Sequence, residues 1–204
     1  MEIERKFLIE RLPKRLAQYP YRLIEQAYLT TAPVIRVRRE SEPVFPAVAD
    51  DSREKETDVL KPAFPAAADE SREKETKAAV SYWLTYKGKG ALAHEEYNLP
   101  LTAEAYETLK SKADGNVISK TRYLLPVVPS ASDPFRPAND PQTPFSSRIV
   151  ELDVFAPPFA PLVLAEVEFE SVEEARSFVP LDWFGQDVTE DPAYHNASMS
   201  RRIF

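Results

Sequence analysis

Apolar and polar residues alternate along most of the chain, with the period of two that indicates β-strands. The alternating segments are rich in Val, Ile, Leu, Tyr and Phe, residues that fit the pleated surface of a sheet. Strands are expected over IERKFLI, VIRVRRE, SYWLTYKGK, HEEYNLPL, ISKTRYLLPV, RIVELDVF and LVLAEVEFE. Seven or more strands combined with few helices predict an α+β fold whose sheet is antiparallel.

Helical spacing of apolar residues is confined to short segments. The segment 102–114 begins with Thr102, a residue type that caps helix N-termini, and continues with apolar residues about one turn apart. The segment 171–178 opens with Ser171, followed three residues later by Glu174, which is the capping-box pattern. These helices are expected to flank the sheet. Shorter helices are expected over residues 12–19 and 194–203.

Two proline-rich stretches interrupt the strand pattern. The first contains a tandem repeat in which 43–61 is followed directly by 62–80, and both copies carry the run SREKET. Two mostly polar copies are too few for a solenoid, so 43–80 is interpreted as a duplicated loop insertion. Residues 126–146 are likewise expected to form a proline-rich loop. With these two insertions, residues 1–204 are expected to form a single domain.

The bulk composition limits the possible functions. Hydrophobic residues make up 43% of the 204 residues, enough to build a core. The formal net charge of −7 disfavours a nucleic-acid partner, although a local basic lining can still attract an anion. The charged, alternating N-terminus differs from a signal peptide, and no apolar run approaches membrane length. The chain is therefore expected to be cytoplasmic, with no membrane and no nucleic-acid partner.

Cysteine is absent and histidine is rare, which restricts the chemistry of any metal site. Without cysteine there is no disulfide, no thiolate-bound zinc and no cysteine nucleophile. The two histidines, His94 and His195, are too few for a histidine-rich centre. A metal would have to be held by carboxylates and water, and such ligands favour hard cations such as Mg²⁺ or Mn²⁺.

Charged residues alternate with apolar ones on the predicted strands. Because residues i, i+2 and i+4 of a strand face the same side, Glu2, Glu4 and Lys6 share one face. Alternation alone proves little, since the solvent face of an ordinary two-faced sheet has the same pattern. The same rule pairs Arg36 with Arg38, Thr85 with Lys87, Lys120 with Arg122, Glu151 with Asp153, and Glu166 with Glu168.

The sorting of these charges by sign is more informative than their alternation. Carboxylates occur together at 151/153 and 166/168, whereas cations occur together at 36/38 and 120/122. Like charges set side by side are unfavourable unless a group of opposite sign lies between them. A metal–polyphosphate site needs such sorting, because carboxylates bind the metal while Arg and Lys bind phosphate oxygens.

A series of motifs resembles, in the same order, the CYTH superfamily of triphosphate tunnel metalloenzymes. The N-terminal run 2–6, EIERK, is similar to the ExExK signature of that family. The resemblance covers nearly the whole chain apart from the two proline-rich stretches, and eight ordered motifs are far more specific than one. The motifs that follow are IRVR (35–38), LTYKG (84–88), EYNLP (96–100), KTRY (120–123), ELDVF (151–155), AEVE (165–168) and DVTEDPAYHN (187–196).

The resemblance implies an antiparallel eight-stranded β-barrel whose interior is a charged tunnel. Residues that match the metal ligands of the family are Glu2, Glu4, Glu166 and Glu168, with Asp153 as a further candidate, and the implied metal is Mg²⁺ or Mn²⁺. Residues that match its phosphate-binding set are Lys6, Arg36, Arg38, Lys87, Lys120 and Arg122. The expected catalytic residues are Glu4, Lys87 and Glu96, of which Glu96 matches a carboxylate that orients the attacking water.

The expected function is metal-dependent hydrolysis of a small-molecule triphosphate, foremost inorganic tripolyphosphate, by a monomer or homodimer. Phosphoryl transfer requires mainly positioning and charge neutralisation, so the chemistry needs no Ser/His pair or cysteine. A class IV-type adenylate cyclase and a thiamine triphosphatase remain alternatives with the same fold. A non-catalytic polyphosphate-binding module is a second alternative, although such a module would gain little from the carboxylates.

Two regions of the sequence allow alternative roles for their residues in the expected site. One face of the segment HEEYNLPL carries His94, Glu96 and Asn98, where the family commonly has several glutamates. His94 is interpreted as a strand-end polar residue, with a role in proton transfer as the alternative, and His195 is interpreted as structural. The arginine pair at 201–202 either reaches phosphate from the last helix or forms a solvated terminal pair.

Overall fold

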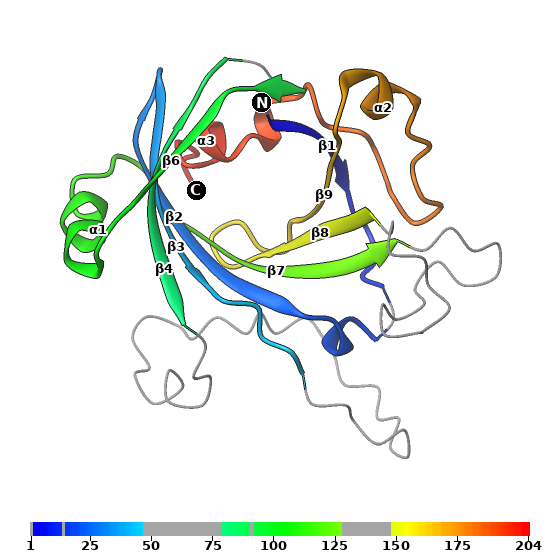
Figure 1. Ribbon diagram of the computed structural model, residues 1–204, viewed down its shortest axis with the longest axis horizontal. Helices are drawn as coiled ribbons and strands as arrows, with labels where there is room; N and C mark the ends of the chain where they lie inside the picture. The colour runs from blue at the N-terminus through cyan, green and yellow to red at the C-terminus, as the bar shows by residue number, and fades with distance from the viewer. Residues whose placement is uncertain (1, 14, 47–78, 90–91, 128–147) are drawn as a thin grey trace.

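The computed structural model describes residues 2–13, 15–46, 79–89, 92–127 and 148–204. Within these ranges the chain forms nine β-strands that curl into a nearly closed barrel (Figure 1). All pairings between them are antiparallel, which confirms the predicted α+β fold with an antiparallel sheet. The strands are β1 (Glu2–Leu8), β2 (Tyr21–Thr31), β3 (Val34–Ser41), β4 (Val80–Lys87), β5 (Ala93–His94), β6 (Glu96–Pro100), β7 (Ile118–Val127), β8 (Arg148–Phe155) and β9 (Val163–Glu168).

The two ends of the sheet meet because β5 and β6 are consecutive in the chain. The spatial order of the strands is β5-β1-β9-β8-β7-β2-β3-β4-β6. β5 pairs with β1, β6 pairs with β4, and only Glu95 separates β5 from β6. The resemblance implied eight strands, and the ninth arises because the segment expected as one strand, HEEYNLPL, divides at Glu95. This division lets one stretch of chain close the barrel on both sides.

β2, the longest strand among the described residues, has no counterpart in the strands expected from the sequence. Its apolar residues Leu23, Ile24, Ala27 and Tyr28 have the spacing of a helix face rather than a strict alternation. The structure explains this spacing, because β2 is buried on both faces. Ile24 lines the inside of the barrel, whereas Ala27 lies under a helix on the outside. A strand covered on both faces loses the alternation of a half-exposed one.

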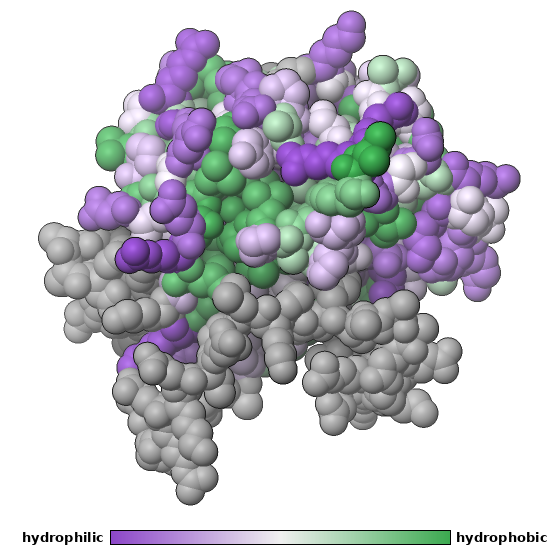
Figure 2. Space-filling model, turned by 180° about the vertical axis from the view of Figure 1, so that it is seen from behind, coloured by the Kyte–Doolittle hydropathy of each residue, from purple (hydrophilic) through white to green (hydrophobic). Residues whose placement is uncertain are grey.

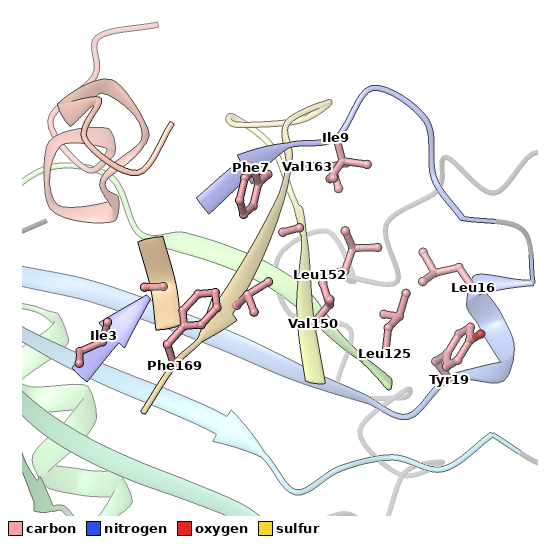
Figure 3. Packing of buried hydrophobic residues seen from close by; sticks show 13 residues of the cluster. Ile3, Phe7, Ile9, Leu16, Tyr19, Leu125, Val150, Leu152, Val163 and Phe169 are labelled. Carbon is pink, nitrogen blue, oxygen red and sulfur yellow. The ribbon is translucent and has the colours of Figure 1, made fainter. Parts of the chain in front are cut away.

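The largest apolar cluster lies on the outside of the barrel wall. Figure 3 shows side chains of β1, β8 and β9 in this cluster, which α2 (Val172–Ser177) and the segment 178–184 cover. Because side chains alternate along a strand, the inward positions of the same strands are left for polar residues. Apolar side chains also reach the surface, as the green area near the centre of Figure 2 shows. The buried members of the cluster are Ile3, Phe7, Ile9, Leu16, Tyr19, Leu125, Val150, Leu152, Val163, Ala165, Val167, Phe169 and Ala175.

A second apolar cluster holds α1 (Ala103–Lys110) against β2, β3 and β4. Tyr106 is fully buried at this contact, and its hydroxyl donates a hydrogen bond to Glu25 at 2.8 Å. The predicted cap is confirmed, because the Thr102 hydroxyl accepts a hydrogen bond from the Ala105 amide at 3.2 Å. The helix is shorter than expected, since the chain turns at 111–112.

A third apolar cluster closes one end of the barrel. The C-terminal segment forms η2 (Pro192–Tyr194) and the short helix α3 (Asn196–Met199), which lies within the ring of strands in Figure 1. The helix expected over 194–203 is therefore present in a shorter form. Met199 packs against residues from the strand ends and from the loop between β8 and β9. The buried members are Tyr28, Ile118, Phe155, Phe159, Leu164, Val188 and Met199.

The other expected helices are also short. At the start of α2 the Ser171 hydroxyl accepts a hydrogen bond from the Glu174 amide at 3.1 Å, as the capping box predicts. The Glu174 carboxylate accepts in return from the backbone amide of Glu170, at 3.0 Å. In the described part of 12–19, helical backbone is limited to the 3-10 turn η1 (Leu16–Gln18). No helix among the described residues has both the length and the apolar character needed to cross a membrane.

Most of the two proline-rich stretches lies outside the described residues. At the first, β3 ends at Ser41 and β4 begins at Val80, and these two residues are direct partners in the sheet. At the second, β7 continues through Val127, so the expected loop 126–146 overlaps the end of a strand. The interpretation of 43–80 as an insertion stays a prediction. The stretch begins just after β3 and ends at the start of its neighbour β4.

Candidate active site

The inward faces of six strands, together with α3, surround a small cavity. All but three of its lining residues are charged, which is the arrangement expected from the strand alternation. The cavity has a volume of about 30 Å³, which is room for one or two water molecules. The lining residues are Glu2, Glu4, Lys6, Ile24, Gln26, Arg36, Arg38, Lys87, Lys120, Arg122, Glu166 and Asn196. Most of the predicted site residues therefore converge here, and Glu96, Asp153 and Glu168 lie next to them.

The N-terminal signature on β1 faces β9 across the sheet. Glu4 is paired with Glu168, and Lys6 with Glu166. The Lys6 ammonium lies 2.9 Å from Glu4 and 2.6 Å from Glu166, and both carboxylates are buried. Burial by itself lowers the pKa of Lys6, but the two carboxylates outweigh burial and raise the pKa above its ordinary value. Lys6 therefore stays protonated and holds carboxylates of both strands together.

A salt bridge on the outer face of β1 holds this signature in place. Arg5 points away from the cavity, lies 2.5 Å from Asp187, and donates to two backbone carbonyls near the end of α2. The Thr189 hydroxyl accepts a hydrogen bond from the backbone amide of Lys6 at 3.0 Å. Burial raises the pKa of Asp187, but the hydrogen bonds from Thr189 and Arg5 lower it overall. The motif 187–196 thus anchors β1 from outside while the acidic signature faces inward.

Arg122 connects three carboxylates of two neighbouring strands. Its guanidinium binds both oxygens of Asp153 at 2.7 Å and also contacts Glu151 and Glu166. Lys120 donates to Asp153 as well, and Asp153 is completely buried. Both oxygens of Asp153 are therefore engaged by cations in this structure. In this position Asp153 orients Lys120 and Arg122, and its expected role as a further metal ligand stays a prediction.

Lys87 lies beside two carboxylates and a histidine on another side of the cavity. Its ammonium lies 2.8 Å from Glu2, 2.7 Å from Glu96 and 3.2 Å from Nε2 of His94. His94 is buried, is the sheet partner of Glu2, and brings Nε2 to 2.6 Å from the Glu2 carboxylate. Burial raises the pKa of Glu2, but His94 and Lys87 outweigh burial and lower it strongly. Glu2, His94 and Glu96 also lie close enough together to hold a cation.

Neutral hydrogen-bonding groups of β4 and β6 hold Glu96 in place. The Thr85 hydroxyl donates to Oδ1 of Asn98 at 2.6 Å, and Nδ2 of Asn98 donates to Glu96 at 3.0 Å. These contacts fix the orientation of Glu96 beside Lys87. His94 is the last residue of β5, as its interpretation as a strand-end polar residue expected, and its side chain contacts Glu2 and Lys87. Only the strand register, which pairs His94 with Glu2, reveals these contacts.

Two arginines of β3 bring positive charge that nearby carboxylates neutralise only in part. Arg36 is 6% exposed and lies 3.7 Å from Glu96, while Arg38 lies 3.4 Å from Glu40. The Nε atoms of both arginines are buried and make no hydrogen bond to any described residue. Burial and the charge of Arg36 lower the pKa of Arg38. Buried cations crowded in this way favour an anion beside them.

The carboxylates of β1, β8 and β9 are crowded in a comparable way. Burial and the charges of Glu151, Glu2 and Glu4 raise the pKa of Glu168 to about 7. A divalent cation would relieve this repulsion, and carboxylate oxygens are the ligands that Mg²⁺ and Mn²⁺ prefer. The charge and chemistry of these carboxylates therefore fit the expected metal, and among the described residues the group whose ligand atoms already lie close enough to share one ion is Glu2, His94 and Glu96. Glu2, Glu4, Glu166 and Glu168 would be the ligands to hold it.

The C-terminal segment contributes Asn196 to the cavity rather than an arginine. Arg202 donates to a backbone carbonyl of its own segment, and Arg201 makes a long contact of 3.9 Å with a surface aspartate. Neither arginine is among the described residues that line the cavity. Nε2 of His195 lies 3.0 Å from the carbonyl oxygen of Thr189, which agrees with its expected structural role. Asn196 was not singled out from the sequence, because a four-residue helix has no periodicity to reveal it.

Known proteins resemble the chain in sequence and in fold. None of the protein-family profiles that were searched matches it. The inorganic triphosphatase of Nitrosomonas europaea is 35% identical over 122 residues, which cover 60% of this chain and 70% of that protein. Crystal structures of the inorganic triphosphatase NE1496 and of the hypothetical protein NE1496 each align with a TM-score of 0.54. Their identities are 26% and 27%, and the alignments cover 100% of this chain and 96% and 100% of theirs. The chain therefore belongs to the family of inorganic triphosphatases, the family that its ordered motifs indicated.

Proposed function

We propose that the chain hydrolyses a linear triphosphate inside the barrel, with inorganic tripolyphosphate as the foremost substrate and Mg²⁺ or Mn²⁺ as the cofactor. The observation that carries the proposal is the sorting of buried charge around one cavity. Carboxylates crowd at β1, β8 and β9, while cations crowd at β3 and β7. The name of the relative from Nitrosomonas europaea supports a triphosphate as the substrate.

Substrate binding requires the cations of the cavity to change partners. In this structure Lys6 and Arg122 contact carboxylates, and the cavity volume of about 30 Å³ is far less than a triphosphate needs. Tripolyphosphate carries roughly four to five negative charges near neutral pH. It can therefore replace the carboxylates as the partner of the cations, which leaves those carboxylates available for the metal. Such an exchange avoids an unpaired buried charge at any stage.

The residues around the cavity divide the work of the proposed reaction. A bound Mg²⁺ or Mn²⁺ would neutralise the negative charge of the phosphates and orient the triphosphate. Arg36, Arg38 and Arg122 donate hydrogen bonds to phosphate oxygens. These contacts hold the anhydride bond that will be cleaved in position, and they stabilise the negative charge that develops on the leaving phosphate. Glu96, which lies 2.7 Å from Lys87, accepts a hydrogen bond from the attacking water and orients it.

The two alternative enzymes, a cyclase and a thiamine triphosphatase, would use the same charged cavity but differ in substrate and product. A cyclase would form a cyclic nucleotide and pyrophosphate from ATP, and a thiamine triphosphatase would require thiamine on the triphosphate. A pure binding module is less compatible with the structure, because anion binding gains nothing from carboxylates crowded around Glu168.

Phosphate release from tripolyphosphate, ATP and thiamine triphosphate tests the proposal. Each substrate is assayed with Mg²⁺, with Mn²⁺ and with EDTA. The expected result is hydrolysis of tripolyphosphate that exceeds that of the two organic substrates and stops with EDTA. A cyclic product from ATP would assign the site to a cyclase. Absence of turnover with either metal, for all three substrates, would refute the hydrolase.

We further propose that the duplicated stretch is an insertion in a single catalytic domain. The support is the direct pairing of Ser41 with Val80, which places the two ends of the stretch close enough for a short turn. Residues 46–78 are replaced by such a turn, which keeps Val44, the bridge partner of Tyr21. Activity is expected to stay within about twofold of the full chain, because surface loops tolerate shortening. Circular dichroism and phosphate release check this, and loss of either would show that the barrel needs the stretch.

A further inference from the structure

Asn196 reaches the cavity from the closed end of the barrel. It is the first residue of α3, and the last residue of the same helix, Met199, is fully buried in the apolar cluster at this end. Asn196 lines the cavity together with Arg36 and Arg38. An uncharged side chain therefore shares the cavity wall with two cations for which phosphate is the proposed partner.

The position of Asn196 is fixed by contacts that hold the C-terminal segment. The side-chain amide of Asn116 donates to the carbonyl oxygens of Ser200 at 3.1 Å and Arg202 at 2.7 Å. The neighbouring Gly115 has a φ of +89°, and a Cβ added there would lie 2.4 Å from the Ser200 oxygen. Glycine is thus required for this close approach. The helix that carries Asn196 is a fixed part of the wall and not a loose chain end.

The side-chain oxygen of Asn196 has no partner. It is buried and accepts no hydrogen bond from any described residue. The Nε atom of Arg36, which belongs to the same lining, makes no hydrogen bond to any described residue either, whereas the Nε of Arg38 has Glu40 as its partner at 3.4 Å. Buried polar atoms in folded proteins nearly always have partners, so each exception calls for an explanation. Two such exceptions in the wall of one cavity, the Asn196 oxygen and the Arg36 Nε, indicate a polar ligand at this end.

We infer that Asn196 binds the terminal phosphate of the substrate at the closed end of the cavity, an inference that rests on the proposed function. The carboxamide can turn about its last side-chain bond, so that its NH₂ group donates to a phosphate oxygen. Arg36 and Arg38 donate to the same phosphate group. A neutral donor suits this position, because a further cation would be repelled by the two arginines.

This contact makes the enzyme selective for the end of a phosphate chain. The helix that carries Asn196 also carries Met199, which packs in the apolar cluster with Phe155 and Phe159. A further phosphate beyond the terminal one would lose its hydration without gaining a partner there. Substrates therefore enter with an unsubstituted terminal phosphate first. Trimetaphosphate, a cyclic triphosphate without a terminal group, cannot use the contact.

Two substitutions at Asn196 separate ligand binding from a structural role. Asn196→Ala is expected to raise the KM for tripolyphosphate about 10- to 100-fold, the range for one hydrogen bond to a charged group, with a smaller change in kcat. The Tm stays the same or rises slightly, because the substitution removes an unpaired polar atom. Asn196→Asp is expected to raise the Tm by pairing with Arg36 and Arg38, yet to weaken tripolyphosphate binding more than Ala does. A purely structural residue would not give opposite signs for stability and affinity.

The measurements are steady-state kinetics, thermal melts, and calorimetric titration of tripolyphosphate and of trimetaphosphate in EDTA. Ser198→Ala, an exposed change on the same helix, is the control and is expected to alter none of them. Binding of trimetaphosphate is expected to be weak and insensitive to Asn196→Ala. Unchanged KM and tripolyphosphate affinity in Asn196→Ala, or a fall in Tm that parallels the loss of activity, would overturn the inference. Either result alongside active wild-type enzyme leaves the proposed function intact, whereas an inactive wild-type enzyme refutes that function itself.

Discussion

Replacement of Glu4 by Gln is expected to reduce metal-dependent hydrolysis of tripolyphosphate by more than about a hundredfold, since even residues that only support metal ligands cost 10- to 100-fold when changed. Glu4 is 6% exposed and faces Glu168 directly across β1 and β9. The amide keeps the shape of the side chain but removes one negative charge from the group of candidate ligands. Lys6 keeps its second partner, Glu166, so the barrel is expected to remain folded.

Phosphate release over a range of Mn²⁺ concentrations measures this effect, together with calorimetric titration of the protein with Mn²⁺. Glu170→Gln is the matched control, because it makes the same chemical change at an exposed position beyond the end of β9. The control is expected to behave like the wild type. Retention of more than half of the wild-type activity in Glu4→Gln would contradict the assignment of Glu4 to the metal.

Replacement of Arg122 by Ala is expected to have the largest effect on stability, a loss of about 3–5 kcal/mol in the free energy of unfolding. Arg122 binds Asp153, Glu151 and Glu166, and all three lie close together in the barrel wall. Its removal leaves Lys120 as the remaining partner of Asp153 and Lys6 as that of Glu166. Glu151 loses the ion-pair partner that the structure shows for it, and the four carboxylate contacts of the guanidinium are lost together. Because Arg122 is also a candidate phosphate ligand, activity is expected to fall with stability.

Urea denaturation at neutral pH measures the loss, and Arg176→Ala serves as the control. Arg176 is exposed on α2, outside the barrel, so its removal is expected to change stability by less than about 0.5 kcal/mol. Arg122→Lys retains the charge but not the planar guanidinium, so its loss of stability is expected to lie between those of Arg122→Ala and Arg176→Ala. A loss below about 1 kcal/mol in Arg122→Ala would show that the contacts of Arg122 are dispensable for folding.

The inward placement of the charged residues could be predicted because it depends only on the alternation of a single strand. Glu4, Lys6 and Arg36 line the cavity for this reason, and the apolar residues between them pack outside the barrel. The same reasoning missed β2, since a strand covered on both faces does not alternate. The pattern is informative only where one side of a strand differs from the other.

Contacts between strands could not be predicted, because they depend on register and on how the barrel closes. His94 reaches Glu2 only because β5 pairs with the start of β1. The contacts of Asp153 with Lys120 and Arg122 likewise follow from the pairing of β7 with β8. Asn196 reaches the cavity through the packing of a four-residue helix, which leaves no pattern in the sequence.

We propose above all that metal and triphosphate bind together inside the barrel, the metal to carboxylates and the triphosphate to arginines and lysines. Crystals of Glu96→Gln protein grown with tripolyphosphate and Mn²⁺ test it most directly, because anomalous scattering locates the Mn²⁺. We predict Mn²⁺ between the carboxylates of Glu2, Glu4, Glu166 and Glu168, with the phosphates against the arginines of β3 and β7. Mn²⁺ or triphosphate bound only on the outer surface, with the pairs around Lys6 and Arg122 unchanged, would contradict it.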